Sequence, residues 1–134
     1  QTMIHEFNRK GKAAGAGFYD YPEGGKKQLW SGLEHWYKEV DISEQEMIDR
    51  FLFVQALDTV RCLEEGVLES VVDANIGSIF GIGFAAWTGG AVQFLNQYGL
   101  TKALNRAEIL EHKYGERFKA PQLLKQKVAE GQRF

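Results

Sequence analysis

A long apolar run, with a helix start and a helix stop at its ends, constrains this fold more than any other stretch. Ser43 is followed three residues later by Glu46, which is the spacing of a capping box. Gly66 supplies the glycine that commonly closes a helix. Most positions between them are apolar, including Met47, Ile48, Phe51, Leu52, Phe53, Val54, Ala56, Leu57, Val60 and Leu63. Because a helix that is apolar on most sides is buried on most sides, residues 43–66 are predicted to form the central helix.

The charged residues of this helix lead to two further predictions. Arg61 and Glu65 are four positions apart, the spacing of a helical ion pair worth ~0.3 kcal/mol if exposed. Arg50 is flanked by apolar residues, so we expect it to be a buried or interface charge.

The rest of the chain adds shorter helices and no convincing strand. Ser70 and Asp73 repeat the capping spacing and open a helix that ends at Gly81 or Gly83. Apolar residues at spacings of three and four predict an amphipathic helix over residues 29–40. Another helix is predicted to start at residues 88–90, to continue through Leu95 and to end at Gly99. Residues 100–114, which precede Gly115, and residues 121–128, which start at Pro121, are also predicted to be helical. The predicted fold class is all-α, a compact multi-helix array without a sustained heptad.

Residues 1–28 are predicted to be an ordered interdomain loop that precedes a helical domain of residues 29–134. Glycine recurs in this loop, and its aromatic residues predict a short extended piece ending at Pro22. A P-loop requires GxxxxGK followed by Ser or Thr, whereas Gln28 follows Lys26 and Lys27. The loop is therefore not expected to bind phosphate.

Residues 77–90, GSIFGIGFAAWTGG, combine backbone freedom with bulky aromatic side chains. Gly81, Gly83 and Ala86 formally match the GxGxxA variant of the dinucleotide fingerprint. That fingerprint needs a preceding β-strand and an acidic residue about 20 positions further on. Here a capped helix precedes the glycines, and the expected region contains Arg106. We therefore predict a packed corner between helices.

Composition and the positions of reactive side chains exclude several classes of function. A net charge of −2 gives no reason to expect nucleic acid as a partner, and no apolar run approaches the ~20 residues of a membrane helix. The single cysteine, Cys62, allows no internal disulfide and favours a reducing compartment. His5, His35 and His112 are far apart, so no metal site is indicated. No serine or cysteine has an obvious base near it in the sequence, so the sequence indicates no catalytic centre. Because Met3 is not the first residue, we expect a segment of a longer protein.

Three stretches of the sequence resemble a known family. Residues 49–90, DRFLFVQALDTVRCLEEGVLESVVDANIGSIFGIGFAAWTGG, closely resemble the C-terminal helical domain of 3-hydroxyacyl-CoA dehydrogenases, as the second copy in multifunctional fatty-acid β-oxidation enzymes. GKAAGAGFYDYP resembles the GRKxGxGFYxY loop joining the two copies, and YGERFKAPQLLKQKVAEGQRF resembles the usual end of such chains. The resemblance implies the 6-phosphogluconate-dehydrogenase C-terminal-like type of all-α fold. The motif and interdomain residues that it implies are Gly15, Gly17, Phe18, Tyr19, Arg50, Arg61, Glu65, Gly66, Gly83, Phe84, Gly89 and Gly90.

The resemblance also implies the chemistry of a parent enzyme. Such an enzyme oxidises L-3-hydroxyacyl-CoA to 3-ketoacyl-CoA with NAD, often with an enoyl-CoA hydratase on the same chain. It would act in the bacterial cytoplasm or in a eukaryotic organellar matrix. In this family the catalytic His–Glu pair and the NAD fingerprint lie in an upstream Rossmann domain. This segment is accordingly expected to bind no cofactor and no metal and to contain no catalytic residue.

Departures from the family pattern assign the segment to the non-catalytic copy. The copy beside the Rossmann domain has an Asn followed by Arg where this chain has Asp49 and Arg50. The second copy packs on the preceding helical domain as a pseudo-dimer. The family's GFPP stands here as GFAA at residues 83–86, and its acidic residue before the glycines stands here as Asn75. Both changes argue against a ligand role for this loop.

Two other functions remain open at this point. The chain could be a free-standing module that holds acyl-CoA or an acyl carrier in a helical groove. It could also be a homo-oligomerising domain, because a central helix that is apolar nearly all round would leave a patch seeking a partner.

Overall fold

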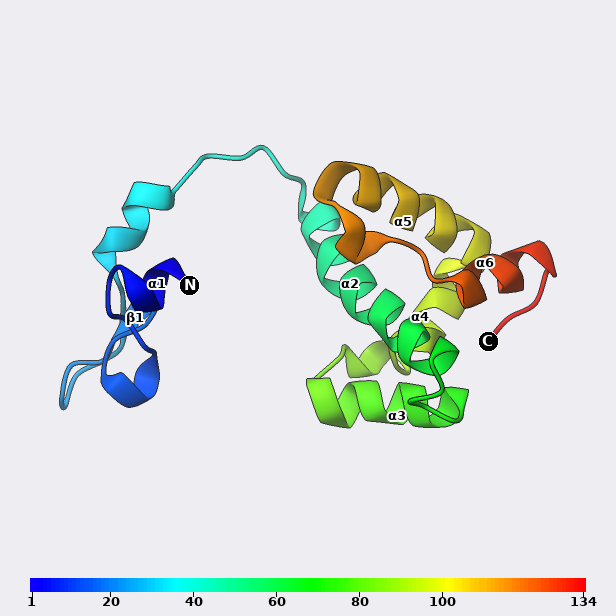
Figure 1. The fold of residues 1–134 in the computed structure, drawn as a ribbon, viewed down its shortest axis with the longest axis horizontal. Helices are drawn as coiled ribbons and strands as arrows, with labels where there is room; N and C mark the ends of the chain where they lie inside the picture. The colour runs from blue at the N-terminus through cyan, green and yellow to red at the C-terminus, as the bar shows by residue number, and fades with distance from the viewer. The chain divides into compact units, whose positions relative to one another are not determined.

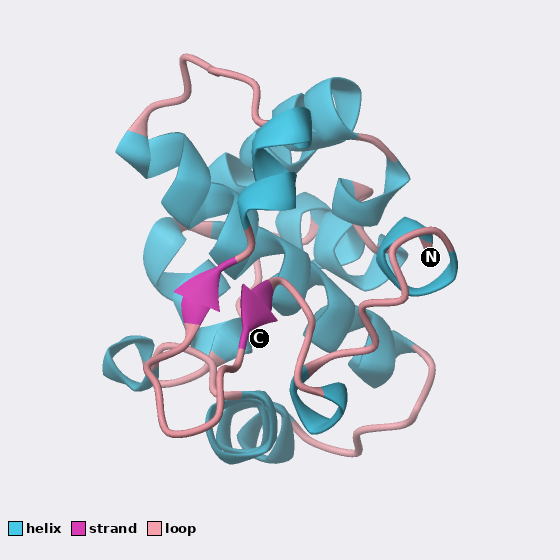
Figure 2. Ribbon diagram, turned by 90° about the vertical axis from the view of Figure 1, so that its left-hand side faces the viewer, coloured by secondary structure: helices cyan, strands magenta, loops and turns pink.

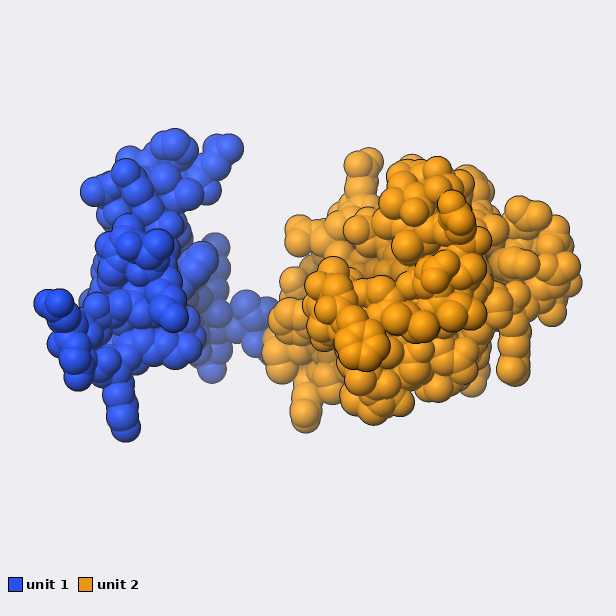
Figure 3. All heavy atoms as spheres, turned by 90° about the horizontal axis from the view of Figure 1, so that it is seen from below, with its two compact units in different colours: residues 1–41 blue, residues 42–134 orange.

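The computed structural model describes all 134 residues, Gln1–Phe134, and divides into two compact units, residues 1–41 and 42–134 (Figure 3). The larger unit is built from helices only, which confirms the all-α prediction (Figure 1). Its α-helices are α2 (Glu44–Glu64), α3 (Val71–Ile82), α4 (Ala91–Tyr98), α5 (Leu100–Tyr114) and α6 (Gln122–Ala129). The short 3₁₀ helices η3 (Ala86–Thr88) and η4 (Glu116–Phe118) connect them.

The predicted start and stop signals of the helices are confirmed. The Ser43 hydroxyl accepts a hydrogen bond from the Glu46 amide at 3.2 Å, and the Ser70 hydroxyl accepts one from the Asp73 amide at 3.1 Å. Gly66 follows α2 with a φ of +73°, in the left-handed region that glycine tolerates. Gly83 ends α3 in the same conformation. These boundaries depend on local chain chemistry, which explains why they could be predicted.

Burial of α2 on most sides was predicted and is wrong. One face, formed by Phe53, Ala56, Leu57 and Val60, is fully buried. The opposite face carries the exposed Phe51, whose exposed fraction is 71%. Helices α3, α4 and α6 all contact α2, and α3 and α5 lie on opposite sides of it in Figure 1. The face of α2 that carries Phe51 remains open.

Aromatic side chains from α2 and α4 join at the centre of the core. The rings of Phe53 and Phe94 meet edge to face at 5.4 Å between centroids, and Tyr98 meets Phe53 at 5.0 Å. Such pairs contribute about 0.5–1.5 kcal/mol beyond the area they bury. Buried leucines from several helices complete the core, namely Leu57, Leu95, Leu110 and Leu124.

The smaller unit contains the only two strands, β1 (Tyr19–Asp20) and β2 (Gln28–Leu29), which pair antiparallel with Tyr19 opposite Leu29 (Figure 2). It also contains α1 (Thr2–His5) and the 3₁₀ helices η1 (Lys12–Ala14) and η2 (Ser31–Trp36). The extended piece expected between Phe18 and Tyr21 is thus confirmed.

The amphipathic helix predicted over residues 29–40 is wrong, because this segment contributes to a different cluster. Residues 28–29 form β2, residues 31–36 form η2, and no helix follows within this unit. Trp30 contacts Phe7 at 5.3 Å and Trp36 at 6.1 Å between ring centroids. The compact unit that contains these rings ends at Asp41.

Arg9 makes contacts with three separate parts of the smaller unit. Its Nε donates to the Gly17 carbonyl at 2.6 Å, its guanidinium pairs with the Asp20 carboxylate, and it stacks over the Trp30 ring at 4.3 Å. A Cβ on Gly17 would lie 3.0 Å from the Gly11 Cα, so the two loop strands pass very close together. The glycine-rich loop is therefore ordered by one arginine and by close backbone contact.

Candidate interaction surface along α2 and α3

The corner between α3 and α4 explains the glycine-rich stretch. Gly90 has a φ of +115° and a ψ of 169°, and a Cβ there would lie 2.5 Å from the Cβ of Asn75. Such a contact excludes every side chain. The predicted packed corner is confirmed, and close approach of two helices is its physical reason.

Side chains from α3 accept hydrogen bonds from the first backbone amides of α4. The Asn75 Oδ1 accepts hydrogen bonds from the amides of Val92 at 3.0 Å and Gln93 at 2.9 Å. The Ser78 hydroxyl accepts one from the Ala91 amide at 3.0 Å. In a dinucleotide loop, amides of this kind would face the phosphates. Here they are already satisfied, so the loop is a structural corner.

An open apolar groove of about 670 Å³ lies between α2 and α3. Its walls include Val54 and Cys62 from α2, and Ala74 and Ile82 from α3. A second hollow of about 330 Å³ lies beside the N-terminal half of α2 and includes Phe51. Val54 and Arg117 line both hollows, which are therefore neighbours, and we call the two hollows together the α2 groove.

Large apolar side chains also stand exposed elsewhere, and those on α3 lie on the face turned away from the groove-lining Ala74, Ser78 and Ile82. Val72, Ile76 and Phe80 follow each other at four-residue spacing on α3, and Phe80 is 85% exposed. Trp87, on η3, is 79% exposed. Contiguous apolar surface of this kind marks an interaction site in soluble proteins. Sequence periodicity does not reveal this exposure, because a periodic pattern cannot tell which apolar face a neighbour covers.

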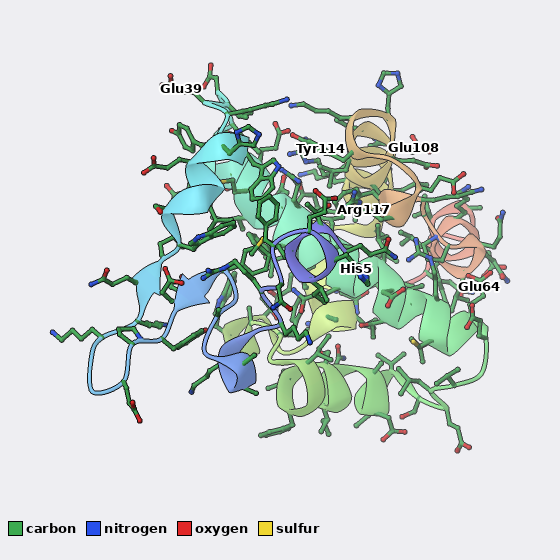
Figure 4. All side chains as sticks on the ribbon, turned by 60° about the vertical axis from the view of Figure 1, so that its left-hand side comes forward. His5, Glu39, Glu64, Glu108, Tyr114 and Arg117 are labelled. Carbon is green, nitrogen blue, oxygen red and sulfur yellow. The ribbon has the colours of Figure 1, made fainter.

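Arginines border the α2 groove. Arg50 is half-buried, and its guanidinium lies 4.1 Å from the centre of the Tyr114 ring. Arg117 has an exposed side chain without an ion pair or a side-chain hydrogen bond. Tyr114 and Arg117 both lie toward the N-terminal half of α2, whereas Glu64 lies near its other end (Figure 4).

The predicted ion pair between Arg61 and Glu65 is not formed. Arg61 pairs with the Asp58 carboxylate at 3.2 Å, and its guanidinium donates to the Lys119 carbonyl at 2.7 Å. The Arg117 carbonyl also accepts from this guanidinium, at 3.4 Å. Arg61 thus ties α2 to the segment between α5 and α6.

A buried ion pair was missed by the sequence reasoning. Asp49 is only 3% exposed, and its carboxylate accepts hydrogen bonds from Arg106 Nε at 2.7 Å and from Gln45 at 2.9 Å. Burial, together with the Asp49 charge, raises the pKa of the Tyr98 hydroxyl. The one available signal was an acidic residue in an otherwise apolar part of a helix. Its partner is 57 residues away, so the pairing could not be predicted.

Glu46 connects the start of α2 to the end of α5. Its carboxylate accepts hydrogen bonds from Lys113 Nζ at 2.5 Å and from the Tyr114 hydroxyl. The hydrogen bond from Lys113, then that from Tyr114, holds the pKa of Glu46 below its ordinary value of 4.5. The hydrogen bond to Glu46 in turn raises the pKa of Lys113 above 10.5. Glu46, the acidic residue of the capping box, therefore makes a tertiary contact between α2 and α5.

The residues implied by the family resemblance are divided between the two compact units. Four lie in the smaller unit, namely Gly15, Gly17, Phe18 and Tyr19. The remaining ones lie in the larger unit, on or after α2 and around the α3–α4 corner, namely Arg50, Arg61, Glu65, Gly66, Gly83, Phe84, Gly89 and Gly90. Phe84 belongs to the core, with 3% exposure. Nowhere do three or more His, Cys, Asp or Glu side chains come together as metal ligands.

Comparison with known proteins relates the chain to fatty-acid oxidation. No protein-family model matches it. A fatty acid oxidation complex subunit alpha from Vibrio cholerae is 38% identical over 114 residues, which cover 83% of this chain and 16% of the relative. The chain is homologous to a part of such alpha subunits. Subunits of the same name from Vibrio vulnificus, 35% identical over 94% of this chain, and from Shewanella amazonensis, 36% identical over 95%, agree with this relationship.

The homology covers most of this chain but a small share of each relative. The chain spans less than a fifth of the length of these three alpha subunits, at 16%, 18% and 19%. The predicted relationship to fatty-acid β-oxidation proteins is therefore confirmed. None of the helices combines the length and the hydrophobicity that crossing a bilayer requires.

Proposed function

We propose that this chain is the helical, non-catalytic C-terminal part of an NAD-dependent L-3-hydroxyacyl-CoA dehydrogenase of fatty-acid β-oxidation. Its role is to pack against the preceding helical domain of the parent chain as a pseudo-dimer. The open α2 groove, which the exposed Phe51 lines, is the observation that carries the proposal, because apolar surface of this kind needs a partner. Homology to part of the alpha subunits supports the pathway.

The polar groups of the larger unit support a structural role. Asp49 stands where the family resemblance would place the active-site Asn, and it is buried in the ion pair with Arg106. Asn75 and Ser78 are used to cap α4. A general acid or base must reach the proton it transfers, and these groups are already engaged inside the fold. NAD and the 3-hydroxyacyl-CoA substrate would bind the Rossmann domain and its neighbouring helical copy.

The proposed compartment follows from the same parent. A bacterial parent would act in the cytoplasm, and a eukaryotic parent in an organellar matrix. An assay of the purified chain with acetoacetyl-CoA and NADH tests the central statement. We expect NADH to be consumed at the rate of the enzyme-free control, and a rate that rises with protein concentration would refute the non-catalytic role.

An acyl-CoA-binding module is the second candidate, and the apolar walls of the α2 groove favour it specifically. The larger hollow of the α2 groove, of about 670 Å³, has the volume of a small-molecule pocket, and Arg117 on its wall would face a phosphate. Titration calorimetry with acyl-CoA separates the candidates. Saturable one-to-one binding by the isolated chain would support the binding module, whereas no heat beyond dilution would support the packing role.

A further inference from the structure

Side chains that donate hydrogen bonds gather in an open hollow of about 490 Å³ at the end of α4 and along α5. We call it the α5 hollow, and it is lined by Tyr98, Lys102, Asn105, Arg106 and Ile109. None of these residues carries a carboxylate, and none of them lines the α2 groove. The α5 hollow is therefore a separate feature of the larger unit, which the packing role does not explain.

Arg106 is held in place with most of its donors unused. Its Nε donates to the buried Asp49 carboxylate at 2.7 Å, and Gln45 donates to the other oxygen of that carboxylate at 2.9 Å. No hydrogen bond within the chain uses the two terminal nitrogens of Arg106, whose side chain is 21% exposed. A guanidinium has five N–H donors in a fixed plane. The pairing with Asp49 therefore fixes its orientation and leaves the other donors for a ligand.

Lys102 adds a second positive charge on the same side of α5. It is exposed, lies four positions before Arg106 and makes no ion pair. Like charges at this spacing repel each other and weaken a helix. Lys102 also lies in the first turn of α5, where the helix dipole disfavours a cation. Because Asp49 balances Arg106 alone, a bound anion would relieve the repulsion.

Two neutral donors complete the α5 hollow. Burial, then the Asp49 charge, raises the pKa of the Tyr98 hydroxyl, while the Arg106 charge lowers it, so this hydroxyl lies near the ion pair. Tyr98 makes no hydrogen bond through its hydroxyl within the chain, and the exposed Asn105 side chain makes none either. Four side chains consequently offer unused donors to the same space.

We infer that the α5 hollow binds a phosphoryl group, with Arg106 and Lys102 as its charged contacts and Tyr98 and Asn105 as neutral donors. A phosphoryl group has three acceptor oxygens for these side chains, whereas a carboxylate has two. Arginine also matches phosphate oxygens with two parallel hydrogen bonds. Ile109, which is 55% exposed, provides an apolar wall for the body of a phosphate monoester. The inference is independent of the packing role proposed above.

The chain's own charges do not account for this arrangement. Compensation of Asp49 explains Arg106 but none of the other donors. The next hollow along α5 shows the contrast, because Glu108 lines it and its Lys113 is already paired with Glu46. The unbalanced positive charge is thus confined to the α5 hollow.

Phosphate titration of the purified chain, followed by heteronuclear NMR, tests the inference. Chloride keeps the ionic strength constant, so general screening does not change during the titration. We expect saturable shifts at the amides of Lys102 and Arg106 and at the Arg106 Nε resonance. The dissociation constant should be on the order of 1 mM, because surface charges are screened by solvent.

Two further ligands identify the chemistry and the source of the phosphoryl group. Benzoate, in which a carboxylate replaces the phosphoryl group, should bind about threefold or more weakly than phenyl phosphate. Tighter binding of phenyl phosphate than of inorganic phosphate assigns the site to a phosphate monoester. Equal binding of the two assigns it to free phosphate.

Variants of the lining residues locate the site. Lys102→Met and Tyr98→Phe should each weaken phosphate binding about three- to tenfold, because each removes one hydrogen-bond donor. Arg106→Lys keeps a cation for Asp49 but loses the planar fork, so it should weaken binding about tenfold. Lys119→Met, a matched change at an exposed lysine without an ion pair, should leave the affinity unchanged. Circular dichroism confirms that each variant is folded, and Lys102→Met changes an exposed side chain only.

Several results would overturn the inference. They are an absence of saturable shifts on α5, equal phosphate affinity of Lys102→Met and the parent sequence, or benzoate binding as tight as that of phenyl phosphate. An equal loss of affinity in Lys119→Met and Lys102→Met would also overturn it, because anions would then be attracted without a site. Failure of the proposed function has a different readout, which is turnover of acetoacetyl-CoA by the isolated chain. The two failures can therefore be told apart.

Discussion

Replacing Gly90 by alanine tests whether the α3–α4 corner is determined by close backbone approach. The new Cβ would meet Asn75 at 2.5 Å, on a residue whose φ is +115° and ψ 169°. A non-glycine residue in that region costs about 1–3 kcal/mol, and overpacking in a tight contact costs about 1–3 kcal/mol more. We therefore expect Gly90→Ala to lower the free energy of unfolding by about 2–6 kcal/mol.

Substitutions at two other glycines of the same region separate the cost of backbone strain from the cost of the contact with Asn75. Gly77 lies inside α3 with open space around it, so Gly77→Ala should stabilise the protein by about 1 kcal/mol. Gly83 has a φ of +73° but no atom within contact range of an added Cβ. Gly83→Ala should consequently cost about 1–2 kcal/mol, from backbone strain alone.

Urea denaturation followed by circular dichroism measures all three variants. With a typical slope of about 1–3 kcal/mol per molar urea, Gly90→Ala should lower the midpoint by roughly 1 M or more, and Gly77→Ala should raise it. If Gly90→Ala unfolds at the midpoint of the parent sequence, the reasoning about close approach is refuted. If Gly83→Ala costs as much as Gly90→Ala, backbone strain rather than the Asn75 contact explains the corner.

Three more predictions concern polar contacts of the larger unit. Asp49→Ala should lower the free energy of unfolding by about 2–4 kcal/mol, because Arg106 loses its buried partner. In calorimetric melts, the double variant Asp49→Leu/Arg106→Met should lose less stability than the two single variants combined. The folded-state pKa of Glu46 lies below 4.5, so its contribution to the free energy of unfolding is complete above pH 4.5 and is lost as the pH falls through the folded value. The pKa of Lys113 is raised above 10.5, so its contribution is complete below pH 10.5 and is lost as the pH rises through the folded value. Glu46→Gln should flatten both limbs of a plot of stability against pH, and unchanged limbs would contradict the assignment. Ser43→Ala and Ser70→Ala should each cost about 1 kcal/mol in urea melts through loss of a helix cap, whereas Ser31→Ala, at a hydroxyl that makes no side-chain hydrogen bond, should be neutral.

The amino-acid sequence by itself determined the helices of the larger unit and their ends. Ser43 and Ser70 cap amides three positions away, and Gly66 and Gly83 adopt the left-handed conformation after the last turn. These interactions join neighbours along the chain, so residue type and spacing suffice to predict them. The same holds for the rejection of a nucleotide loop at residues 77–90, because the preceding helix could be predicted from its cap.

Tertiary structure alone decided which apolar faces are covered and which charges pair. Asn75 caps α4 from α3, 17 residues before the amide of Val92, and Asp49 meets Arg106 at a separation of 57. Residues 29–40 have a helical pattern, yet Trp30 joins the aromatic cluster of the smaller unit and the segment forms no α-helix. Periodicity reports that a face is apolar, but only packing shows what covers it. That is why α2 could be predicted as a helix, while its open groove could not.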